Sequence, residues 1–219
     1  MIIAIDGPSG SGKSTLGRML ARALKLLYID TGSMYRAVAL AVIEAHVDPA
    51  DREAVTALAN KIEIDLEGDP ESLAVLLDGR DITDQIRSES VTDMSSIVST
   101  IPGVRRAMVE RQRAMGKRGA VLNGRDIGTV VFPDADVKFF LTAVPEERAE
   151  RRYKEDQKTS GSSVTYADTL ADMIERDRRD STRADSPLKV AHDAVVIDST
   201  GKSIDEVFAE MMANVHRHH

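Results

Sequence analysis

A glycine-rich loop near the amino terminus constrains the fold of this chain most. Residues 7–14 read Gly-Pro-Ser-Gly-Ser-Gly-Lys-Ser, which matches the phosphate-binding pattern G-x-x-x-x-G-K-[ST]. The apolar run 1–5 predicts a buried strand before the loop, and apolar residues at helical spacing predict a helix over 15–26 after it. This order of strand, loop and helix favours a phosphate site over a chance Gly/Ser turn that contains a lysine.

The residue types in the loop suit the phosphates of a nucleotide. Glycines allow successive backbone N–H groups to point at one anion, and the N-terminus of the following helix adds a partial positive charge. Lys13 can reach the terminal phosphates, and the Ser14 hydroxyl can bind Mg²⁺. The predicted nucleotide-binding residues are Gly7, Pro8, Ser9, Gly10, Ser11, Gly12, Lys13, Ser14 and Thr15. Asp6 and Asp30 are either water-mediated partners of the metal or structural residues.

Short apolar strands alternate with helices along the rest of the chain. We predict further strands at 27–30, 120–122, 137–141 and 194–197, and further helices at 34–45, 51–61, 88–100, 102–117, 145–156, 166–183 and 203–215. Thr31 or Ser33 is the expected cap of the helix over 34–45. This pattern predicts one α/β domain over residues 1–219, a P-loop core with a five-stranded parallel sheet between helices, and ligands at the carboxyl ends of the strands.

Residues 62–82 interrupt this alternation. The segment 62–66 alternates apolar and polar residues, 73–77 is apolar, and Asp78-Gly79 is a dipeptide typical of hairpin turns. We therefore predict a small antiparallel sheet, inserted in a substrate-side subdomain that spans about residues 36–100.

Charge and composition exclude several classes of protein. The net charge is −7 and there is no cysteine, so we expect no general nucleic-acid binding and no thiolate metal site. No apolar run approaches the length of a membrane span, and we expect a monomer in the cytoplasm without a membrane partner. The segment Asn60-Lys61-Ile62-Glu63 is not the N-K-x-D stretch of a GTPase, and the five histidines suggest no ligand cluster. The terminal residues 216–219 are expected to be a solvated tail.

A basic stretch runs against this acidic trend. Between residues 101 and 125 there is one acid, Glu110, and seven basic residues, Arg105, Arg106, Arg111, Arg113, Lys117, Arg118 and Arg125. Arg125 follows an apolar strand on the ligand side of the sheet, where its guanidinium could grip a second phosphate. We expect Arg106, Arg111 and Arg118 to form a solvated helix face.

Two groups of arginines further along the chain allow two interpretations. Arg176, Asp180 and Arg183 lie on one face of a predicted helix. Arg148, Arg151 and Arg152 share a face of the helix before it, and a Gly/Ser-rich loop at 158–165 separates the two helices. Either these residues form a mobile lid that carries arginines to a transferring phosphoryl group, over about 148–175, or they form ion pairs within the helices.

Several motifs, in order along nearly the whole chain, resemble the bacterial cytidylate kinase family. They are 5–15 with the phosphate loop, 30–36 (Asp-Thr-Gly-Ser-Met-Tyr-Arg), 104–105 with 112–113, 175–183 and 198–200. The most specific is 124–135, Gly-Arg-Asp-Ile-Gly-Thr-Val-Val-Phe-Pro-Asp-Ala. The insertion at 62–82 also resembles the enlarged monophosphate-binding domain of this family. The resemblance implies a kinase that moves the γ-phosphate of ATP to CMP and dCMP with Mg²⁺; a related kinase for another acceptor and an ATP-gated binding module are the alternatives.

The resemblance also implies roles for individual residues. Lys13 and Ser14 would hold the ATP phosphates and Mg²⁺, while Thr31, Arg36 and Arg125 would grip the acceptor phosphate. The family often has serine in place of Thr31, which keeps the hydroxyl. Ser96, Arg105 and Asp126 would read the cytosine ring, and Arg176 and Asp180 would contact the sugar and phosphate. The arginines implied at the transferring phosphoryl group are Arg152, Arg176 and Arg183.

Overall fold

The main sheet is built as the apolar strands predict. A computed structural model describes residues 1–160 and 164–217. Its five parallel strands lie in the order β2-β6-β1-β7-β8. Their bounds are β1 (Ile2–Asp6), β2 (Leu27–Asp30), β6 (Ala120–Gly124), β7 (Val137–Thr142) and β8 (Val195–Asp198). Because β1 is the central strand, the phosphate loop that follows it begins at the middle of the carboxyl edge.

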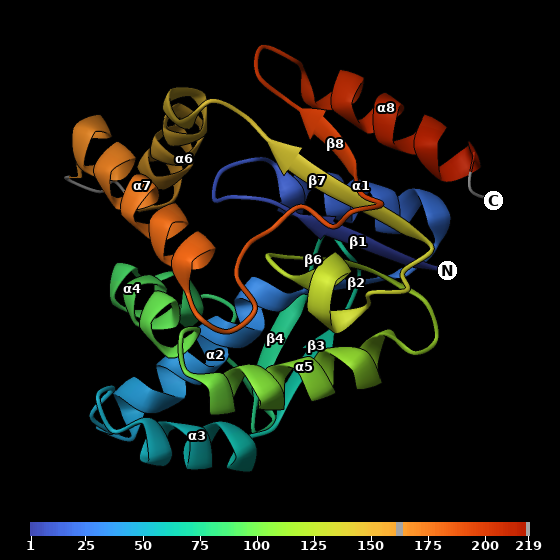
Figure 1. Ribbon diagram of the computed structural model, residues 1–219. Coiled ribbons are helices and arrows are strands. Elements are labelled where there is room, and N and C mark those ends of the chain that lie inside the picture. The colour runs from blue at the N-terminus through green and yellow to red at the C-terminus, as the bar shows by residue number, and fades with distance from the viewer. Residues whose placement is uncertain (161–163, 218–219) are drawn as a thin grey trace.

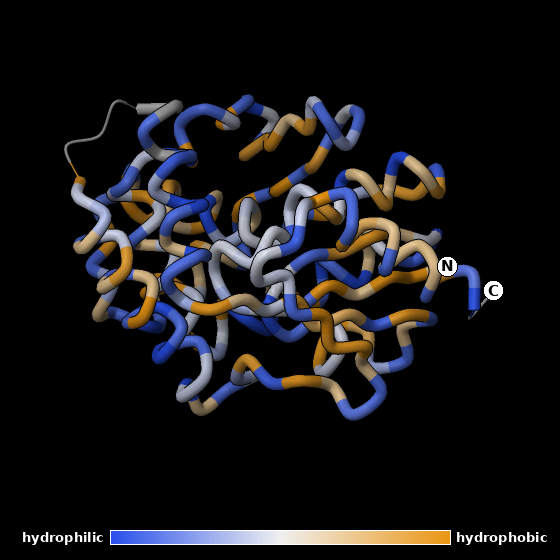
Figure 2. Tube along the Cα trace, turned by 90° about the horizontal axis from the view of Figure 1, so that it is seen from above, coloured by the Kyte–Doolittle hydropathy of each residue, from blue (hydrophilic) through white to orange (hydrophobic). Residues whose placement is uncertain are grey.

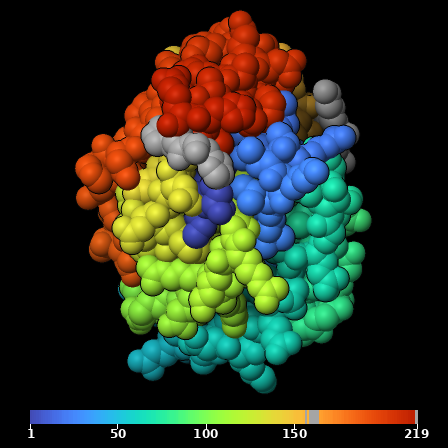
Figure 3. Space-filling model, turned by 90° about the vertical axis from the view of Figure 1, so that its right-hand side faces the viewer, coloured from blue at the N-terminus to red at the C-terminus, as the bar shows by residue number. Residues whose placement is uncertain are grey.

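Helices cover both faces of this sheet, and each face has its own hydrophobic core. Helices α1 (Lys13–Leu24) and α8 (Ile204–Arg217) pack on one face, where Ile3 and Ile5 of β1 lie. Helices α2 (Thr31–Glu44) and α5 (Pro102–Gly116) pack on the other face, where Ala4 lies. Figure 3 shows α8 in red beside the blue N-terminal segment. The start of β1 and the end of α8 lie on the same side of the molecule in Figures 1 and 2.

The insertion forms the predicted antiparallel sheet. Strands β3 (Ile64–Glu67), β4 (Ala74–Leu77) and β5 (Arg80–Asp81) lie in that order, with positive φ angles at Asp78 and Gly79 in the hairpin turn. Helix α3 (Arg52–Lys61) precedes the sheet, and the 3₁₀ turn η1 (Gln85–Arg87) and helix α4 (Glu89–Val98) follow it. The apolar side of the insertion joins the core around α2, so α2 connects the insertion with the main sheet.

Helices α6 (Pro145–Ser160) and α7 (Tyr166–Thr182) lie side by side after β7 (Figure 1). The predictions that α6 ends at 156 and that a loop begins at 158 are wrong, because α6 continues to Ser160. No glycine or proline occurs between Glu146 and Ser160 to break the helix. The rest of the predicted loop includes 161–163, which lie outside the described residues. Thr165 then starts α7 with a capping box to Asp168.

The start of α2 also differs from the prediction. The helix begins at Thr31 rather than Met34, and neither Thr31 nor Ser33 caps it. The Asp30 carboxylate accepts the N–H groups of Gly32 and Ser33, which draws the predicted turn into the helix. A π-helical turn, η2 (Ile127–Val131), follows β6 and was not predicted. Arg217 ends α8, so part of the predicted tail at 216–219 is helical. Within 1–160 and 164–217, no helix has the length and apolar character needed to cross a membrane.

Candidate active site

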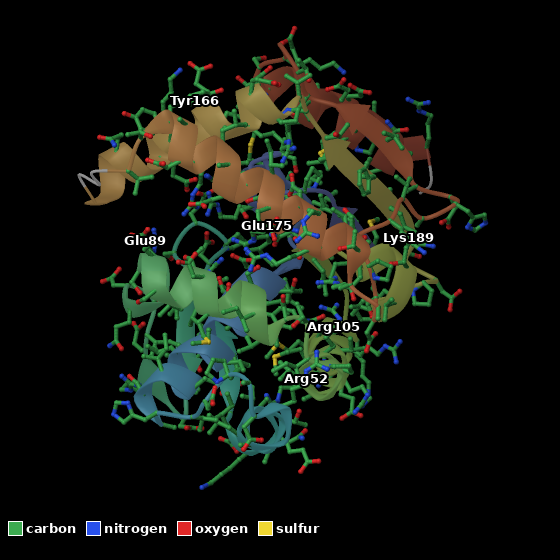
Figure 4. All side chains as sticks on the ribbon, turned by 60° about the vertical axis from the view of Figure 1, so that its left-hand side comes forward. Arg52, Glu89, Arg105, Tyr166, Glu175 and Lys189 are labelled. Atoms are coloured by element: carbon green, nitrogen blue, oxygen red, sulfur yellow. The ribbon has the colours of Figure 1, made fainter. Side chains whose placement is uncertain are left out.

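A large cleft opens at the carboxyl edge of the main sheet, with a volume of about 1440 Å³. Figure 4 shows α7 with Glu175 on one side of the opening and α4, beginning at Glu89, on the other. The sequence-predicted residues that line it are Ser9, Gly10, Ser11, Gly12, Lys13, Ser14, Thr15, Thr31, Arg36, Arg105, Arg125, Asp126, Arg152, Arg176, Asp180 and Arg183. Gly7, Pro8 and Ser96 lie outside this lining. One cleft therefore brings together residues that are up to 174 positions apart in the sequence.

The phosphate loop is tightly folded at the floor of this cleft. Gly7 has a φ of 149°, and a Cβ atom there would overlap the carbonyl oxygen of Leu141, so only glycine fits. The Lys13 side chain is buried, and its Nζ donates to the Pro8 carbonyl at 2.5 Å and to the Ser11 Oγ at 3.3 Å. Burial, and then the charge of Arg125, lower the pKa of Lys13 well below its ordinary value. A polyanion in the cleft would raise the pKa of this lysine again.

Oxygen atoms suited to Mg²⁺ gather beside the loop. The Ser14 Oγ accepts a hydrogen bond from Asn123 Nδ2 at 3.3 Å, and Asp30 Oδ1 lies 3.5 Å from the same nitrogen. The Asn123 Oδ1 is buried and has no hydrogen-bond partner in the described part of the chain. Hydroxyl, carboxylate and amide oxygens are hard donors, so this set fits Mg²⁺.

Asp6 has a structural task in the described structure. Its two carboxylate oxygens accept the backbone N–H groups of Ile127 and Gly128, each at 2.8 Å. These residues begin the π-helical turn η2 directly after Arg125 and Asp126, so Asp6 holds the segment that carries both. Burial raises the pKa of the Asp6 carboxyl to about 6, although the two N–H donors oppose this shift.

The raised pKa of Asp6 predicts a pH dependence of folding. A carboxyl with a higher pKa in the folded state than in the unfolded chain stabilises the fold fully below the unfolded value, near 3.8, and this contribution is lost as the pH rises through about 6. A shift of about two units corresponds to about 3 kcal/mol. We expect the free energy of unfolding of the wild type, relative to Asp6→Asn, to fall by up to this amount from about pH 4 to about pH 7 in urea titrations. A difference that stays constant over this range would contradict the prediction.

Arg105 and Asp126 form a buried ion pair in the cleft wall, through Arg105 Nη2 and Asp126 Oδ2. The Arg105 guanidinium also lies 5.5 Å from the centre of the Tyr35 ring, and it donates to the Ser99 carbonyl at 3.1 Å. The Tyr35 hydroxyl is buried without a partner among the described residues. Two opposite charges and an aromatic ring therefore form a compact surface for a planar polar group.

The charges continue from this pair toward α7. The Arg183 Nη2 lies 3.8 Å from Asp126 Oδ1, and the Arg183 Nη1 lies 3.5 Å from Asp180 Oδ1. Asp180 Oδ2 accepts from Arg125 Nε at 2.8 Å. Although burial opposes it, the cations Arg125, Arg176 and Arg183 hold the pKa of Asp180 below its ordinary value. The five residues Arg105, Asp126, Arg183, Asp180 and Arg125 thus form a chain of alternating charge.

The remaining predicted acceptor residues lie around this chain. Arg36 Nη2 donates to the Ser33 Oγ at 2.8 Å, and Thr31 Oγ1 donates to the Asn123 carbonyl at 2.8 Å. Ser96 is buried, and its hydroxyl has no partner within the described ranges. Ser95 and Ser99 on either side of it line the cleft instead. A role for Ser96 in binding stays a prediction.

Comparison with known proteins identifies the family. A family model described as cytidylate kinase matches residues 3–217. The chain belongs to the cytidylate kinase family. This confirms the resemblance seen in the sequence, and it makes the protein a phosphotransferase with a P-loop kinase fold.

Individual relatives agree with this assignment over nearly the whole chain. A protein named cytidylate kinase from Pelotomaculum thermopropionicum is 49% identical over 215 residues, which are 97% of this chain and 95% of that protein. Another of the same name from Solibacter usitatus is 50% identical over 209 residues, covering 94% and 88%. A solved structure of an uncharacterized protein from Eubacterium ventriosum shares the fold, with a TM-score of 0.53, 12% identity and coverage of 99% and 98%.

In this member of the cytidylate kinase family, α7 presents its predicted face to the cleft. Arg176, Asp180 and Arg183 all line it. Burial and the charge of Arg125 lower the pKa of Arg176 to about 10. The charge of Asp180 acts on Arg176, but the ion pairs of this carboxylate among the described residues are with Arg125 and Arg183. Arg176 is therefore placed to bind an anion in the cleft.

The three arginines at the start of α6 have separate surroundings. Arg148 is buried against the phosphate loop. Arg151 and Arg152 both line the cleft, and Arg151 also donates to the Ser199 carbonyl and hydroxyl. The expectation of a solvated basic face on α5 is wrong for Arg111, whose Nη2 donates to the Ile62 carbonyl at 2.6 Å at the end of α3. Arg106 and Arg118 are exposed, as predicted.

Sequence reasoning gave no role to Tyr35, Asn123 and Asp177, and it placed Arg148 on the face of a possible lid and not at the phosphate loop. Tyr35 lies within the motif at 30–36, and Asn123 directly precedes the motif at 124–135, but neither had a predicted role. Arg148 and Asp177 hold the phosphate loop from α6 and α7. The sequence could have pointed to Asp177 in one way, because it follows Arg176 in the family motif. Its contact with Ser9 could not be predicted, since the two residues are 168 positions apart.

Proposed function

We propose that this protein transfers the γ-phosphate of ATP to CMP, and also to dCMP, giving ADP with CDP or dCDP. The observation that supports this most directly is the buried pair Arg105–Asp126 in the same cleft as the phosphate loop. Membership of the cytidylate kinase family and the names of the relatives point to the same acceptor.

The base would be read by the charges of this pair. The Asp126 carboxylate can accept from the exocyclic amino group of cytosine, and the Arg105 guanidinium can donate to the ring carbonyl and nitrogen, with Ser96 as a further donor. Uracil has no amino group at that position. It would leave a buried acceptor unpaired, which costs about 1–3 kcal/mol.

The phosphates would be held by cations on both sides of the reaction. Lys13 and the backbone N–H groups of residues 7–15 would hold the ATP phosphates, while Arg36 and Arg125, with Thr31, would hold the acceptor phosphate. Ser14 would bind the metal, with Asp30 and Asn123 behind it. Mg²⁺ would supply neutralisation of phosphate charge and orientation of the ATP oxygens.

No general base is needed, because the attacking atom is a phosphate oxygen that is already anionic near neutral pH. The residues of the cleft place the two substrates in line and neutralise the charge on the transferring group. We assign the neutralisation to Arg152, Arg176 and Arg183. Asp180 and Arg176 would also contact the sugar. A lid of about residues 148–175 and the subdomain of about residues 36–100 would close over the substrates and exclude water, which limits ATP hydrolysis. We propose that the protein acts as a monomer in the cytoplasm.

A substrate panel tests this proposal. We expect ADP release from ATP and Mg²⁺ to be fast with CMP and dCMP, and at least about 10-fold slower with UMP, AMP or GMP, because each lacks the cytosine pattern of donors and acceptors. The measurement is a coupled assay of ADP with each acceptor supplied separately. Fast release with another acceptor would move the assignment to a different kinase, and release that ignores the acceptor would indicate an ATPase or a switch.

A further inference from the structure

Both helices that follow β7 hold the peptide groups of one residue in the phosphate loop. The Ser9 N–H donates to Asp177 Oδ1 of α7 at 3.1 Å, and the Ser9 carbonyl accepts from Arg148 Nη1 of α6 at 2.8 Å. The same Arg148 Nη1 lies 2.5 Å from Asp177 Oδ2. Arg148 and Asp177, which we call the Ser9 clamp, therefore close a ring of hydrogen bonds on the loop.

The Ser9 clamp is buried and braced. Only 7% of the Arg148 side chain and 17% of the Asp177 side chain are exposed, and Arg148 Nε donates to the Ala143 carbonyl at 2.9 Å. Gly10 packs so closely beneath it that a Cβ atom would lie 2.7 Å from the Arg148 carbonyl oxygen and 2.9 Å from Met173 Cε. The phosphate loop and the facing turns of α6 and α7 thus form one closely packed unit.

This contact, together with the Asp180–Arg125 pair, fixes the rotation of α7 about its own axis. Successive residues of an α-helix point about 100° apart. With Asp177 directed at Ser9, the preceding residue, Arg176, is directed into the cleft, and Asp180 and Arg183 follow on the same side. Without the clamp, α7 has no other hydrogen bond to the phosphate loop among the described residues that would fix this orientation.

We propose that Arg148 and Asp177 are positioning residues, which hold Arg176 over the phosphate loop by gripping the peptide groups of Ser9. This inference rests on the proposed function, since it assigns the placement of an arginine that acts on the transferring phosphoryl group. It also restricts any lid movement to the parts of α6 and α7 beyond the clamp. A displaced Arg176 weakens charge neutralisation during transfer more than it weakens recognition of the acceptor base.

Removal of Asp177 separates these effects. We expect Asp177→Ala to lower kcat by about 10- to 100-fold, because a misplacement of about 1 Å in a catalytic group costs up to about 100-fold. The KM for CMP should change less than about 3-fold. Asp172→Ala, an exposed aspartate on the same helix, is the matched control and should keep wild-type kinetics. All values are scaled to the folded fraction, and Asp177→Asn replaces Asp177→Ala if the latter does not fold.

A double-mutant comparison shows whether Asp177 acts through Arg176. If it does, Asp177→Ala combined with Arg176→Ala will have the same kcat as Arg176→Ala alone. Two effects that multiply would overturn the proposal, and so would a normal kcat per folded molecule in Asp177→Ala and in Asp177→Asn.

Hydrogen exchange of the Ser9 amide does not require catalysis, so it tests the Ser9 clamp independently of the proposed function. In the ligand-free protein, the Ser9 amide should exchange with solvent at least about 10-fold faster in Asp177→Ala than in Asp172→Ala, because its acceptor is gone. Unchanged exchange would overturn the clamp whatever the acceptor is. Faster exchange in a protein that shows no CMP-dependent ADP release would leave the clamp in place and reject the assignment of the substrate.

Discussion

Replacement of Lys13 by alanine is expected to lower kcat at least about 100-fold, because this lysine is the cation at the floor of the cleft nearest the centre of the phosphate loop. Its Nζ donates to the Pro8 carbonyl and Ser11 Oγ, so the amine is held in place before the substrates bind. Burial lowers the pKa of Lys13, and the developing charge of a transferring phosphoryl group favours its protonated form. The loss should therefore fall on the chemical step.

The measurement is steady-state ADP release with saturating ATP, Mg²⁺ and CMP. Lys117→Ala serves as the control, because Lys117 is exposed at the end of α5, away from the cleft. Thermal unfolding of both variants shows whether the fold is retained. Near-normal turnover in a folded Lys13→Ala protein would count heavily against a kinase that uses this loop.

The second large effect is expected from the buried pair Arg105–Asp126, which would read the base of the acceptor. We expect Asp126→Ala and Arg105→Ala each to raise the KM for CMP by about 10- to 100-fold and to leave the KM for ATP within about 3-fold, because a lost hydrogen bond to a buried polar group costs about 1–3 kcal/mol. The decisive quantity is the difference between the change in the KM for CMP and the change in the KM for ATP. Equal effects on CMP and ATP would move the base-reading site elsewhere in the cleft.

Stability must be measured alongside these kinetics. Removal of one partner from a buried ion pair leaves the other charge unpaired and costs about 3–5 kcal/mol of folding free energy. The double variant removes both charges and should recover part of this loss. The pair Glu175–Arg178 on the exposed face of α7 is the matched control, and alanine there should change the free energy of unfolding by less than about 1 kcal/mol.

The parallel sheet and the phosphate loop could be predicted because their signals are local. Segments of three to five mostly apolar residues mark each strand, and the glycines, lysine and serine of the loop lie within eight positions. The end of α6 could not be placed as well, since the polar residues before Ser160 fit a loop and a charged helix equally. The cap of α2 was misplaced by one or three residues, because Asp30, Thr31 and Ser33 all belong to types that cap helices.

Most of the predicted residues line the cleft, but the sequence did not predict which of them pair with one another. Spacing on a helix placed Arg176, Asp180 and Arg183 on one face, and the structure directs that face into the cleft. The same reasoning put Arg148 with Arg151 and Arg152, yet Arg148 turns to Ser9 and Arg151 to Ser199. Residues three and four apart on a helix are close neighbours, but which elements pack against each of them is decided by tertiary contacts that spacing does not encode.

The alternating charges from Arg105 to Arg125 have a consequence for how this protein can change in evolution. Each inner member of the series is within 4 Å of two members of opposite sign. A substitution at one position therefore changes how much the neighbouring charges contribute to folding and binding. Whether a substitution is tolerated at one position depends on which residues occupy the others. We therefore expect these five positions to change together in evolution. A new base preference should need several replacements at once, and single replacements should be removed by selection.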